Sequence, residues 1–244
     1  VVGAISATSS PALAQAASAP AEAQAGPAVE AIVVTARRRE ENLMTVPVAV
    51  SVLSGAAIEN RGIKSVSDLT QYTPGLFSQT GNQGIVTRGA TRLTFRGLSA
   101  TAGSVFIDGA PYTGTGAPDL TDVERVEALK GPQSVYFGRS TFSGALNYVT
   151  KKPGNRFAGR VTAEAFSYKG FDGTLSVEGP IIQDRLSFRA NVRRYTFGGQ
   201  YKNNGDGGNR LGAQDTTGVS LALSATPTDN LRISGFYTYA LDDD

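Results

Sequence analysis

The sequence from Leu93 to Pro153, LTFRGLSATAGSVFIDGAPYTGTGAPDLTDVERVEALKGPQSVYFGRSTFSGALNYVTKKP, decides the fold of the first part of the chain. It consists of short β-branched or apolar runs that are separated by glycines at points where a chain turns. The run Val105–Ile107 ends at Asp108-Gly109, which is a turn signal, and Leu146–Thr150 is a second strand-like run. This stretch therefore predicts short strands joined by tight turns.

The segment Asp122–Lys130 lies between these two runs and ends at Gly131-Pro132. Val123, Val126 and Leu129 are spaced three residues apart in it. That spacing fits either one turn-rich helix or a strand entered through a short helical turn.

The composition excludes several classes of function. The 244 residues carry a formal charge of +2, which argues against a dedicated nucleic-acid binder. The chain has no cysteine and no histidine, so it lacks a thiol nucleophile, the commonest general base and the commonest metal ligand. We therefore expect a protein that is not an enzyme and that has no cofactor and no metal site. No stretch approaches the roughly 20 apolar residues of a membrane-spanning helix, although the alternating strands of a membrane barrel would give a weaker signal.

The N-terminal part is low in complexity. Residues 1–15 are rich in Ala and Ser, and Ala12-Leu13-Ala14 before Gln15 fits a signal-peptidase site, so we interpret them as a signal-peptide remnant; a disordered Ala-rich leader is the alternative. Residues 16–41 are predicted to be a flexible spacer. It contains the isolated β-prone heptad EAIVVTA at residues 30–36. Such a heptad can add itself to the edge of another protein's sheet, or it can be the first strand of the domain that follows.

Residues 154–244 alternate apolar and polar side chains, which predicts five antiparallel strands of about 9–11 residues. The strands are expected at residues 157–165, 173–179, 186–193, 219–225 and 231–239. Short turns are predicted near 180–184 and 227–230, and a long polar connection at 198–215. A soluble β-sandwich would alternate too, but long connections on one side with short turns on the other are typical of outer-membrane barrels.

The motifs FRG, IDG, DVERVEALKGPQSVYFGR and SGALNYVTKKP, in this order, resemble the plug domain of TonB-dependent outer-membrane receptors. VPVAVSVLS and DLTQYTPGL extend the resemblance back to about Asn42. The resemblance implies an α+β plug domain at residues 42–153, a small mixed sheet with short helices. It also implies that residues 154–244 are the first antiparallel strands of an incomplete transmembrane β-barrel, which in plugged transporters has about 22 strands. The chain is thus expected to be a fragment that cannot close a barrel by itself.

The resemblance also implies roles for particular residues. The heptad becomes the TonB box, formed by Glu30, Ala31, Ile32, Val33, Val34, Thr35 and Ala36. We expect residues 32–36 to be flexible in the free protein and to become a strand when TonB binds. Docking of the plug to the barrel is assigned to Arg96, Glu124, Arg125, Glu127 and Lys130. Lys130 stands where the family has arginine, and we expect it to pair with Glu124 or Glu127 inside the plug. The motif glycines are Gly97, Gly109, Gly131, Gly138 and Gly144. Ligand contacts are expected at Arg88, Tyr112 and Thr113, in loops where ordinary solvated side chains are the alternative.

The function implied by the resemblance is active uptake of a scarce solute, driven by the proton gradient of the inner membrane. The implied partners are TonB with its inner-membrane motor complex, outer-membrane lipid and a small-molecule substrate, of which an iron–siderophore complex is the commonest class. The location would be the outer membrane of a Gram-negative cell, with plug and TonB box facing the periplasm. Carbohydrate, cobalamin, haem or an aromatic compound are alternative substrates. A receptor that also signals, and a non-transporting β-rich surface binding protein, are alternative functions.

Overall fold

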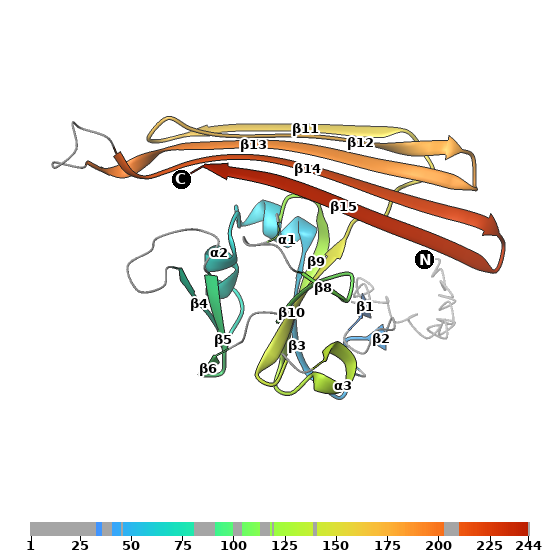
Figure 1. Cartoon of the computed structure of the whole chain (residues 1–244), viewed down its shortest axis with the longest axis horizontal. Helices are drawn as coiled ribbons and strands as arrows, with labels where there is room; N and C mark the ends of the chain where they lie inside the picture. The colour runs from blue at the N-terminus through green and yellow to red at the C-terminus, as the bar shows by residue number, and fades with distance from the viewer. Residues whose placement is uncertain are drawn as a thin grey trace, which may run out of the picture. The chain divides into compact units, whose positions relative to one another are not determined.

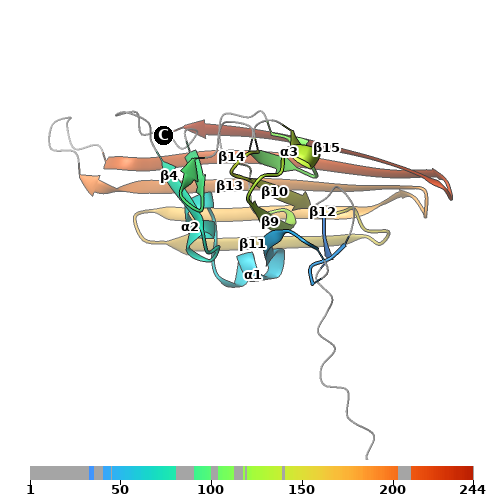
Figure 2. The ribbon, with the colours of Figure 1, turned by 90° about the horizontal axis from the view of Figure 1, so that it is seen from below.

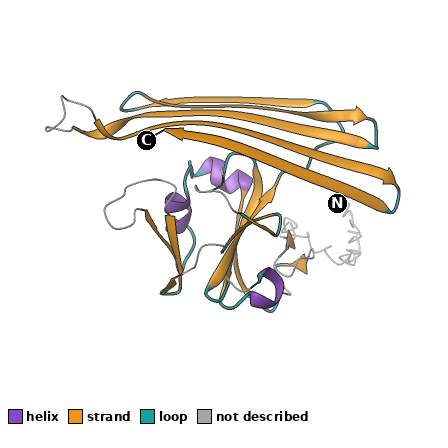
Figure 3. Ribbon diagram, viewed as in Figure 1, coloured by secondary structure: helices purple, strands orange, loops and turns teal. Residues whose placement is uncertain are grey.

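The structure is a computed structural model that describes residues 33–35, 41–44, 46–80, 91–99, 104–112, 118, 120–138, 141–202 and 210–243. Within these ranges strands predominate, and the helices are short (Figure 3). The predicted signal-peptide remnant and most of the predicted spacer lie outside the described residues.

A mixed five-stranded sheet is the centre of the first part of the chain (Figure 1). Its order is β3-β9-β10-β7-β8, with β10 and β7 parallel and the other pairs antiparallel. The strands are β3 (Ala49–Ser54), β9 (Val123–Lys130), β10 (Gly144–Thr150), β7 (Val105–Ile107) and β8 (Ala110–Pro111). The segment that allowed either a helix or a strand is therefore the strand β9. The α+β plug fold with a small mixed sheet is confirmed.

Two short helices pack their buried residues into one apolar cluster, and each is capped as its sequence suggests. Helix α1 (Gly55–Asn60) follows Ser54, whose side chain accepts a hydrogen bond from Ala57 N at 3.2 Å. Helix α2 (Val66–Gln71) starts with a capping box in which Ser65 and Asp68 bond each other's backbone N–H. A third helix, α3 (Ser134–Phe137), has no side-chain cap. Side-chain caps of this kind stabilise a helix by about 1 kcal/mol. In the described part of the chain, no helix is long and apolar enough to span a membrane.

Apolar clusters lie on both faces of the sheet, because alternate residues of its central strands point in opposite directions. Val126 and Ala128 of β9 belong to the larger cluster, which includes Leu69 of α2 and Leu146 of β10. The smaller cluster contains Leu129 of β9 with residues from other elements, namely Val34, Phe106, Phe137 and Ala145. Both faces of β9 are therefore covered, and Glu127 lies on the side of the smaller cluster.

A second sheet holds three antiparallel strands in the order β4-β5-β6. They are β4 (Leu76–Thr80), β5 (Thr91–Phe95) and β6 (Leu98–Ser99). The loop expected around Arg88 does not extend past residue 90, because residues 91–94 belong to β5 and pair with β4. Neither β4 nor β5 has a sequence pattern that identifies it alone, and their pairing is therefore not predictable from either strand. Residues 81–90, Arg88 among them, lie outside the described residues.

The FRG and IDG motifs are the turns of two hairpins. Arg96-Gly97 joins β5 to β6, and Asp108-Gly109 joins β7 to β8. Both residues of each pair have positive φ, 49° and 85° in the first turn and 48° and 78° in the second. Two-residue hairpin loops with positive φ at both positions match the twist of the strands they join. The motifs thus have a backbone reason that is independent of any ligand.

All five motif glycines adopt positive φ, between 78° at Gly109 and 158° at Gly144. Gly144 is also the most closely packed of them. A Cβ atom there would lie 2.6 Å from the carbonyl oxygen of Leu129 and 2.7 Å from the ring of Phe95. The start of β10 therefore requires glycine for both conformation and space.

Residues after Pro153 form an antiparallel sheet in the order β11-β12-β13-β14-β15, which Figure 2 shows as a row of neighbouring strands. The strands are β11 (Ala158–Phe166), β12 (Gly170–Ile182), β13 (Leu186–Lys202), β14 (Arg210–Thr228) and β15 (Leu231–Asp243). The five predicted strands are confirmed, and the sheet is not closed in the described part of the chain. Several are longer than predicted. The connection expected at 198–215 is mostly strand, because β13 runs to Lys202 and β14 begins at Arg210.

The two faces of this sheet have opposite polarity, and the polar face is the buried one. Ser176, Arg189, Asn191 and Arg193 are buried. The residues that alternate with them are apolar and exposed, among them Val161, Leu175, Val177, Val192, Val219, Leu221, Leu223, Ile233, Tyr237 and Tyr239. Strand register places these apolar side chains on one face, with Leu175 opposite Val192 and Leu221 opposite Tyr237. This arrangement is the reverse of what a water-soluble sheet shows.

Candidate functional site

The predicted TonB box contacts the plug through its central residues. Val33 and Val34 form the strand β1 (Val33–Val34), which pairs antiparallel with β2 (Glu41–Asn42). Val34 is fully buried in the smaller apolar cluster, whereas Val33 is 40% exposed. Alternate burial of this kind is what a short strand lying on a surface produces.

The next residue, Thr35, binds the buried carboxylate of Glu127, which is 92 positions away in the sequence. Thr35 N donates to Glu127 Oε1 at 2.8 Å. Its hydroxyl Oγ1 lies 3.1 Å from Oε1 and 3.0 Å from Oε2. Glu127 is 0% exposed, so these bonds form away from water. Hydrogen bonds to a carboxylate in such surroundings are among the stronger ones in proteins.

Two further side chains complete the surroundings of Glu127. Arg125 Nε donates to Oε1 at 2.8 Å, and Arg125 also forms an ion pair with Glu124. Asn147 Nδ2 of the neighbouring strand β10 donates to Glu127 Oε2 at 3.3 Å and to Thr35 Oγ1 at 3.2 Å. The Glu127 carboxylate thus accepts hydrogen bonds from three different residues.

This geometry differs from the flexible segment expected at 32–36. Val33–Thr35 is attached to the plug by strand pairing, by burial of Val34 and by the Thr35–Glu127 bonds. No local pattern near Thr35 predicts this contact, because the partner Glu127 lies on β9. Glu30, Ala31, Ile32 and Ala36 lie outside the described residues.

The five residues assigned to docking fall into two groups. Glu124, Arg125 and Glu127 form one network on β9. Arg96, in its hairpin turn, is exposed. Burial, and then the positive charge of Arg96, lower the pKa of Lys130. The expected pairing of Lys130 with Glu124 or Glu127 is wrong, since Lys130 Nζ donates to Ser51 Oγ at 2.6 Å while both glutamates pair with Arg125. Among the described residues, none of the five forms an ion pair with β11–β15.

Other ion pairs join the plug to the strands. Lys64, just before α2, lies 2.6 Å from Glu164 of β11 and 3.1 Å from Asp172 of β12. Burial opposes the charge of Lys64, but hydrogen bonds to and the charges of Glu164 and Asp172 outweigh it, so the pKa of Lys64 is raised. Asp172 is also 2.9 Å from Arg193 of β13. Lys64 of the plug thus forms one charged cluster with residues of β11, β12 and β13.

A second group of ion pairs involves Asp122, the residue before β9. Arg189 of β13 binds Asp122 at 2.6 Å and Glu178 of β12 at 2.9 Å. Glu59 of α1 pairs with Lys151 at 3.2 Å and with Arg160 of β11 at 2.9 Å. These contacts were missed in the sequence. The sequence signal for these ion pairs is the set of charged residues on the polar side of the alternating strands. A barrel strand that faced only water would not need charged residues there.

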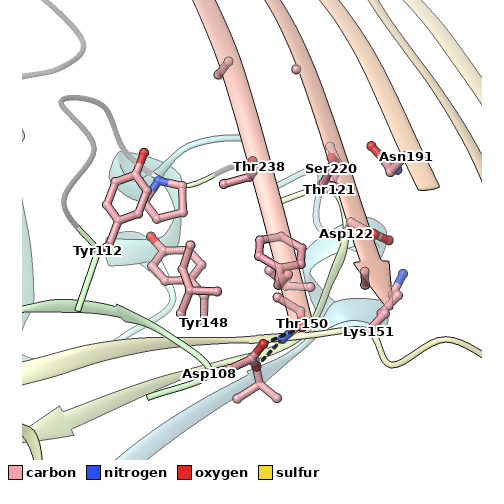
Figure 4. Close-up of a pocket in the computed structure, with 18 of the residues that line it drawn as sticks. Asp108, Tyr112, Thr121, Asp122, Tyr148, Thr150, Lys151, Asn191, Ser220 and Thr238 are labelled. Atoms are coloured by element: carbon pink, nitrogen blue, oxygen red, sulfur yellow. Dashed lines mark hydrogen bonds between the residues drawn. The ribbon is translucent and has the colours of Figure 1, made fainter. Parts of the chain in front are cut away.

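A cavity of about 1780 Å³ lies between the plug and the polar face of β13–β15. Figure 4 shows that its wall is rich in hydroxyl and amide groups, including Tyr112, Thr121, Tyr148, Asn191, Ser220 and Thr238. Asp108 accepts hydrogen bonds from Thr150 N at 2.9 Å and from Thr150 Oγ1 at 2.6 Å, the dashed lines in Figure 4. A polar, roomy lining of this kind suits a hydrated passage or a polar solute.

Of the three predicted ligand contacts, Tyr112 lines this cavity. Burial, and then the negative charge of Asp242, raise the pKa of Tyr112. Tyr148 beside it is 1% exposed, and among the described residues its hydroxyl has no hydrogen-bond partner. Burial is also the main cause that raises the pKa of Tyr148. Arg88 and Thr113 lie outside the described residues. In the same described ranges, no group of acidic side chains is arranged to hold a metal ion.

Known proteins show the same combination of sequence and fold. Residues 42–145 match the family model of the TonB-dependent Receptor Plug Domain. The chain is 27% identical over 214 residues to the pesticin receptor of Yersinia pestis, a match that covers 84% of this chain and 31% of that receptor. It is 32% identical over 143 residues to the catecholate siderophore receptor Fiu of Escherichia coli K12, covering 58% of this chain and 18% of Fiu.

Solved structures agree in fold. The ferric yersiniabactin uptake receptor FyuA from Yersinia pestis superposes with a TM-score of 0.71 at 24% identity, over 80% of this chain and 32% of FyuA. The ferripyoverdine receptor of the outer membrane of Pseudomonas aeruginosa gives 0.72 at 19% identity, over 85% of this chain and 27% of that one. The chain spans less than a third of the length of each of these relatives. Residues 42–145 of the chain therefore belong to the TonB-dependent receptor plug domain family.

Proposed function

We propose that this chain acts in TonB-dependent uptake of a ferric siderophore across the outer membrane of a Gram-negative cell. In this proposal the strands β11–β15 belong to a transmembrane barrel, the plug closes its pore, and the segment 30–36 is the TonB box that the energised partner TonB pulls from the periplasm. Carbohydrate, cobalamin, haem or an aromatic compound would be imported by the same route if the substrate class differs.

The observation that carries the proposal is the polarity of the β11–β15 sheet together with its attachment to the plug. Exposed Leu221 and Ile233 face outward, which suits the hydrocarbon of a bilayer. Buried Arg189 and Arg193 face the other way, and Arg189 binds the plug residue Asp122. Charged residues inside a membrane protein face its interior and are paired there. A soluble or surface binding protein would have no use for this arrangement.

Support for the TonB box comes from its position and chemistry. Val33 and Val34 lie directly before the plug and already form a strand, so the same backbone can pair with a strand of another protein. Val33 is the more exposed of the two valines. Contact with TonB would require the segment to leave Glu127, because the Thr35 N–H is occupied in the docked form.

The substrate class rests on the relatives. They include a catecholate siderophore receptor and a ferric yersiniabactin uptake receptor, although the chain covers only part of each. The hydroxyl-rich wall of the cavity is compatible with a polar, multiply hydrogen-bonding solute. We therefore assign ferric siderophores as the substrate class.

Replacing Val33 with proline tests the proposal. Proline removes the N–H that strand addition needs, while the exposed side chain at this position contributes little packing. In cells that produce the membrane-inserted receptor, we expect uptake of radioactive iron as siderophore complexes to stop in the Val33→Pro variant. Val33→Ala, which keeps the N–H, is the matched control and should transport normally.

Surface binding of the ferric siderophore should be the same in all three proteins, because Val33 does not line the cavity, although Thr35 of the same segment does. Unchanged uptake by the Val33→Pro variant would count against a TonB box at this position. Uptake of cobalamin or an oligosaccharide, with no uptake of any iron complex from a panel of catecholate, hydroxamate and phenolate siderophores, would overturn the substrate class.

A further inference from the structure

Glu127 is a fully buried carboxylate with an unusual set of partners. Arg125 on its own strand and Asn147, its direct partner across the β9–β10 ladder, belong to the sheet. Thr35 does not, since it follows the two-residue strand β1 at the edge of the plug. One of the three groups that satisfy this carboxylate is therefore carried by a segment outside the central sheet.

We propose that Glu127 is the positioning residue that holds the Val33–Thr35 segment in its docked place on the plug, and that breaking the Thr35–Glu127 contact is the step that frees the segment for a partner. The proposal rests on the proposed function only in taking this segment to be the one that a partner protein receives. The docking itself is a property of the chain alone.

The Glu127 carboxylate contributes only hydrogen-bond acceptors to its contacts. Oε1 accepts from Thr35 N and from Arg125 Nε, and Oε2 accepts from Asn147 Nδ2, while the Thr35 hydroxyl lies within 3.1 Å of both oxygens. An amide at this position would place its NH₂ group opposite either the Thr35 and Arg125 N–H groups or the Asn147 NH₂ group. Glutamine therefore has the size of glutamate but not its pattern of acceptors.

Burial makes the contact between Thr35 and Glu127 costly to break. Glu127 is inaccessible to solvent in the docked form, so departure of Thr35 leaves a buried acceptor short of donors unless water enters. A buried polar group that loses its partner costs more free energy than the net gain of the bond it had made. Val34 adds an apolar contribution, since it leaves a closed cluster when the segment departs. The segment is consequently held by the polar contacts of Thr35 with Glu127 and Asn147, by the burial of Val34 and by the pairing of β1 with β2.

The chain contains no cysteine, so a single introduced thiol can be labelled without background. A nitroxide label on Val33→Cys reports the segment from its exposed side and leaves Val34 and Thr35 in place. Measured in the purified, membrane-inserted receptor without TonB, the label should be largely immobile. We expect Glu127→Gln to raise the ratio of mobile to immobile label about tenfold, equivalent to about 1.4 kcal/mol. Thr35→Val, which loses the hydroxyl but keeps the N–H, should give a smaller rise, and Thr35→Ser should resemble the parent.

The double variant Thr35→Val with Glu127→Gln separates a direct contact from a general weakening of the plug. If the two side chains act through each other, the double variant should exceed the larger single effect only slightly. Ser51→Ala is the control, because it removes another hydrogen bond of β9, that of Lys130, without touching the segment. It should leave the label immobile.

Unchanged label mobility in Thr35→Val and Glu127→Gln overturns the proposal, and so does an equal rise in Ser51→Ala. If Glu127→Gln does not fold, Thr35→Val decides alone, because it changes only the docked segment. These results do not depend on transport. Loss of uptake in Val33→Pro with no effect of Glu127→Gln on label mobility would keep the proposed function and remove the positioning role. Unchanged uptake in Val33→Pro with raised label mobility in Glu127→Gln would keep the positioning role and remove the proposed function.

Discussion

Arg189 of β13 holds Asp122, the residue that precedes β9, through two guanidinium nitrogens: Nε lies 2.8 Å and Nη2 2.6 Å from Asp122 Oδ1. The side chains are only 10% and 13% exposed, and Arg189 also reaches Glu178 at 2.9 Å. Glu127 lies five positions later, within β9, so the continuous segment 122–127 carries both the contact to β13 and the contact to the Val33–Thr35 segment. This segment is thus the physical link between the two.

Replacing Asp122 with asparagine should loosen the plug from the strands. The amide keeps the size of the side chain but leaves Arg189 with Glu178 as its remaining carboxylate partner. Removing one partner of a buried ion pair costs about 3–5 kcal/mol, and some of this will be regained through Glu178. The measurement is the urea concentration at which the plug of the membrane-inserted receptor becomes accessible to protease. Asp229→Asn, the same change in an exposed turn, is the control and should leave that concentration unaltered. Equal behaviour of the two variants would show that Asp122 does not anchor the plug.

The Lys64 contact should be insensitive to pH until the solution is strongly alkaline. Burial disfavours the Lys64 ammonium, but its bonds to Glu164 and Asp172 reverse this, so its pKa in the folded protein is above the ordinary value. A raised pKa means that the stabilisation is fully present below the pKa of the unfolded chain, about 10.4, and is lost as pH rises through the folded value. Hydrogen exchange of the α2 amides should therefore be constant between neutral pH and about pH 9 after correction for intrinsic rates, and rise above pH 10. Lys64→Arg should abolish the alkaline rise, and a rise that persists in it would refute the assignment to Lys64.

Much of the fold was accessible from local sequence, because the features concerned depend on neighbours in the chain. Ser54 and Ser65 cap helices within three residues of themselves, and Asp108-Gly109 ends a strand by its own turn preference. Alternation of apolar and polar residues predicts β14 and β15 equally well. Their pairing is also predictable, because the sheet pairs its strands in sequence order. The long strand β13 was underestimated, because Gly198 and Gly199 interrupt its pattern near its end.

The contacts of the candidate site were not accessible in the same way. Thr35 and Glu127 are 92 positions apart, and Arg189 and Asp122 are 67 apart. Nothing in the sequence near Thr35 distinguishes an acceptor on β9 from one on another protein. Charge alone predicts a glutamate partner for Lys130. Strand pairing instead puts β3 beside it, and Ser51 Oγ accepts a hydrogen bond from its ammonium group. Charge predicts that a group will be paired, whereas register decides with which partner.

Arg96 occupies a turn position that arginine seldom adopts, with φ of +49°. A residue other than glycine or asparagine in this region costs about 1–2 kcal/mol. We expect Arg96→Asn to be more stable than Arg96→Val by about that amount, because asparagine tolerates the conformation and a β-branched side chain does not. Both variants lack the guanidinium, so a loss of plug attachment common to both measures its charge, and the difference between them measures the turn. The melting temperature of the purified receptor provides the comparison. Equal melting temperatures for the two variants would mean that the turn relaxes at no cost.

Tyr148 carries a hydroxyl that is buried beside the cavity with no partner among the described residues. The ring packs in the larger apolar cluster and is 1% exposed, so Tyr148→Phe keeps the apolar contacts and removes only the oxygen. Removing a buried polar group that makes no hydrogen bond should leave the free energy of unfolding unchanged or raise it by up to about 1 kcal/mol. Leu146→Ala, in the same strand and cluster, is the contrasting variant and should lower it by about 2–5 kcal/mol. Both are measured by thermal unfolding of the purified receptor. A clear loss of stability in Tyr148→Phe would mean that an ordered water in the cavity accepts or donates a bond at this hydroxyl, and the polar wall would then be hydrated as far as Tyr148.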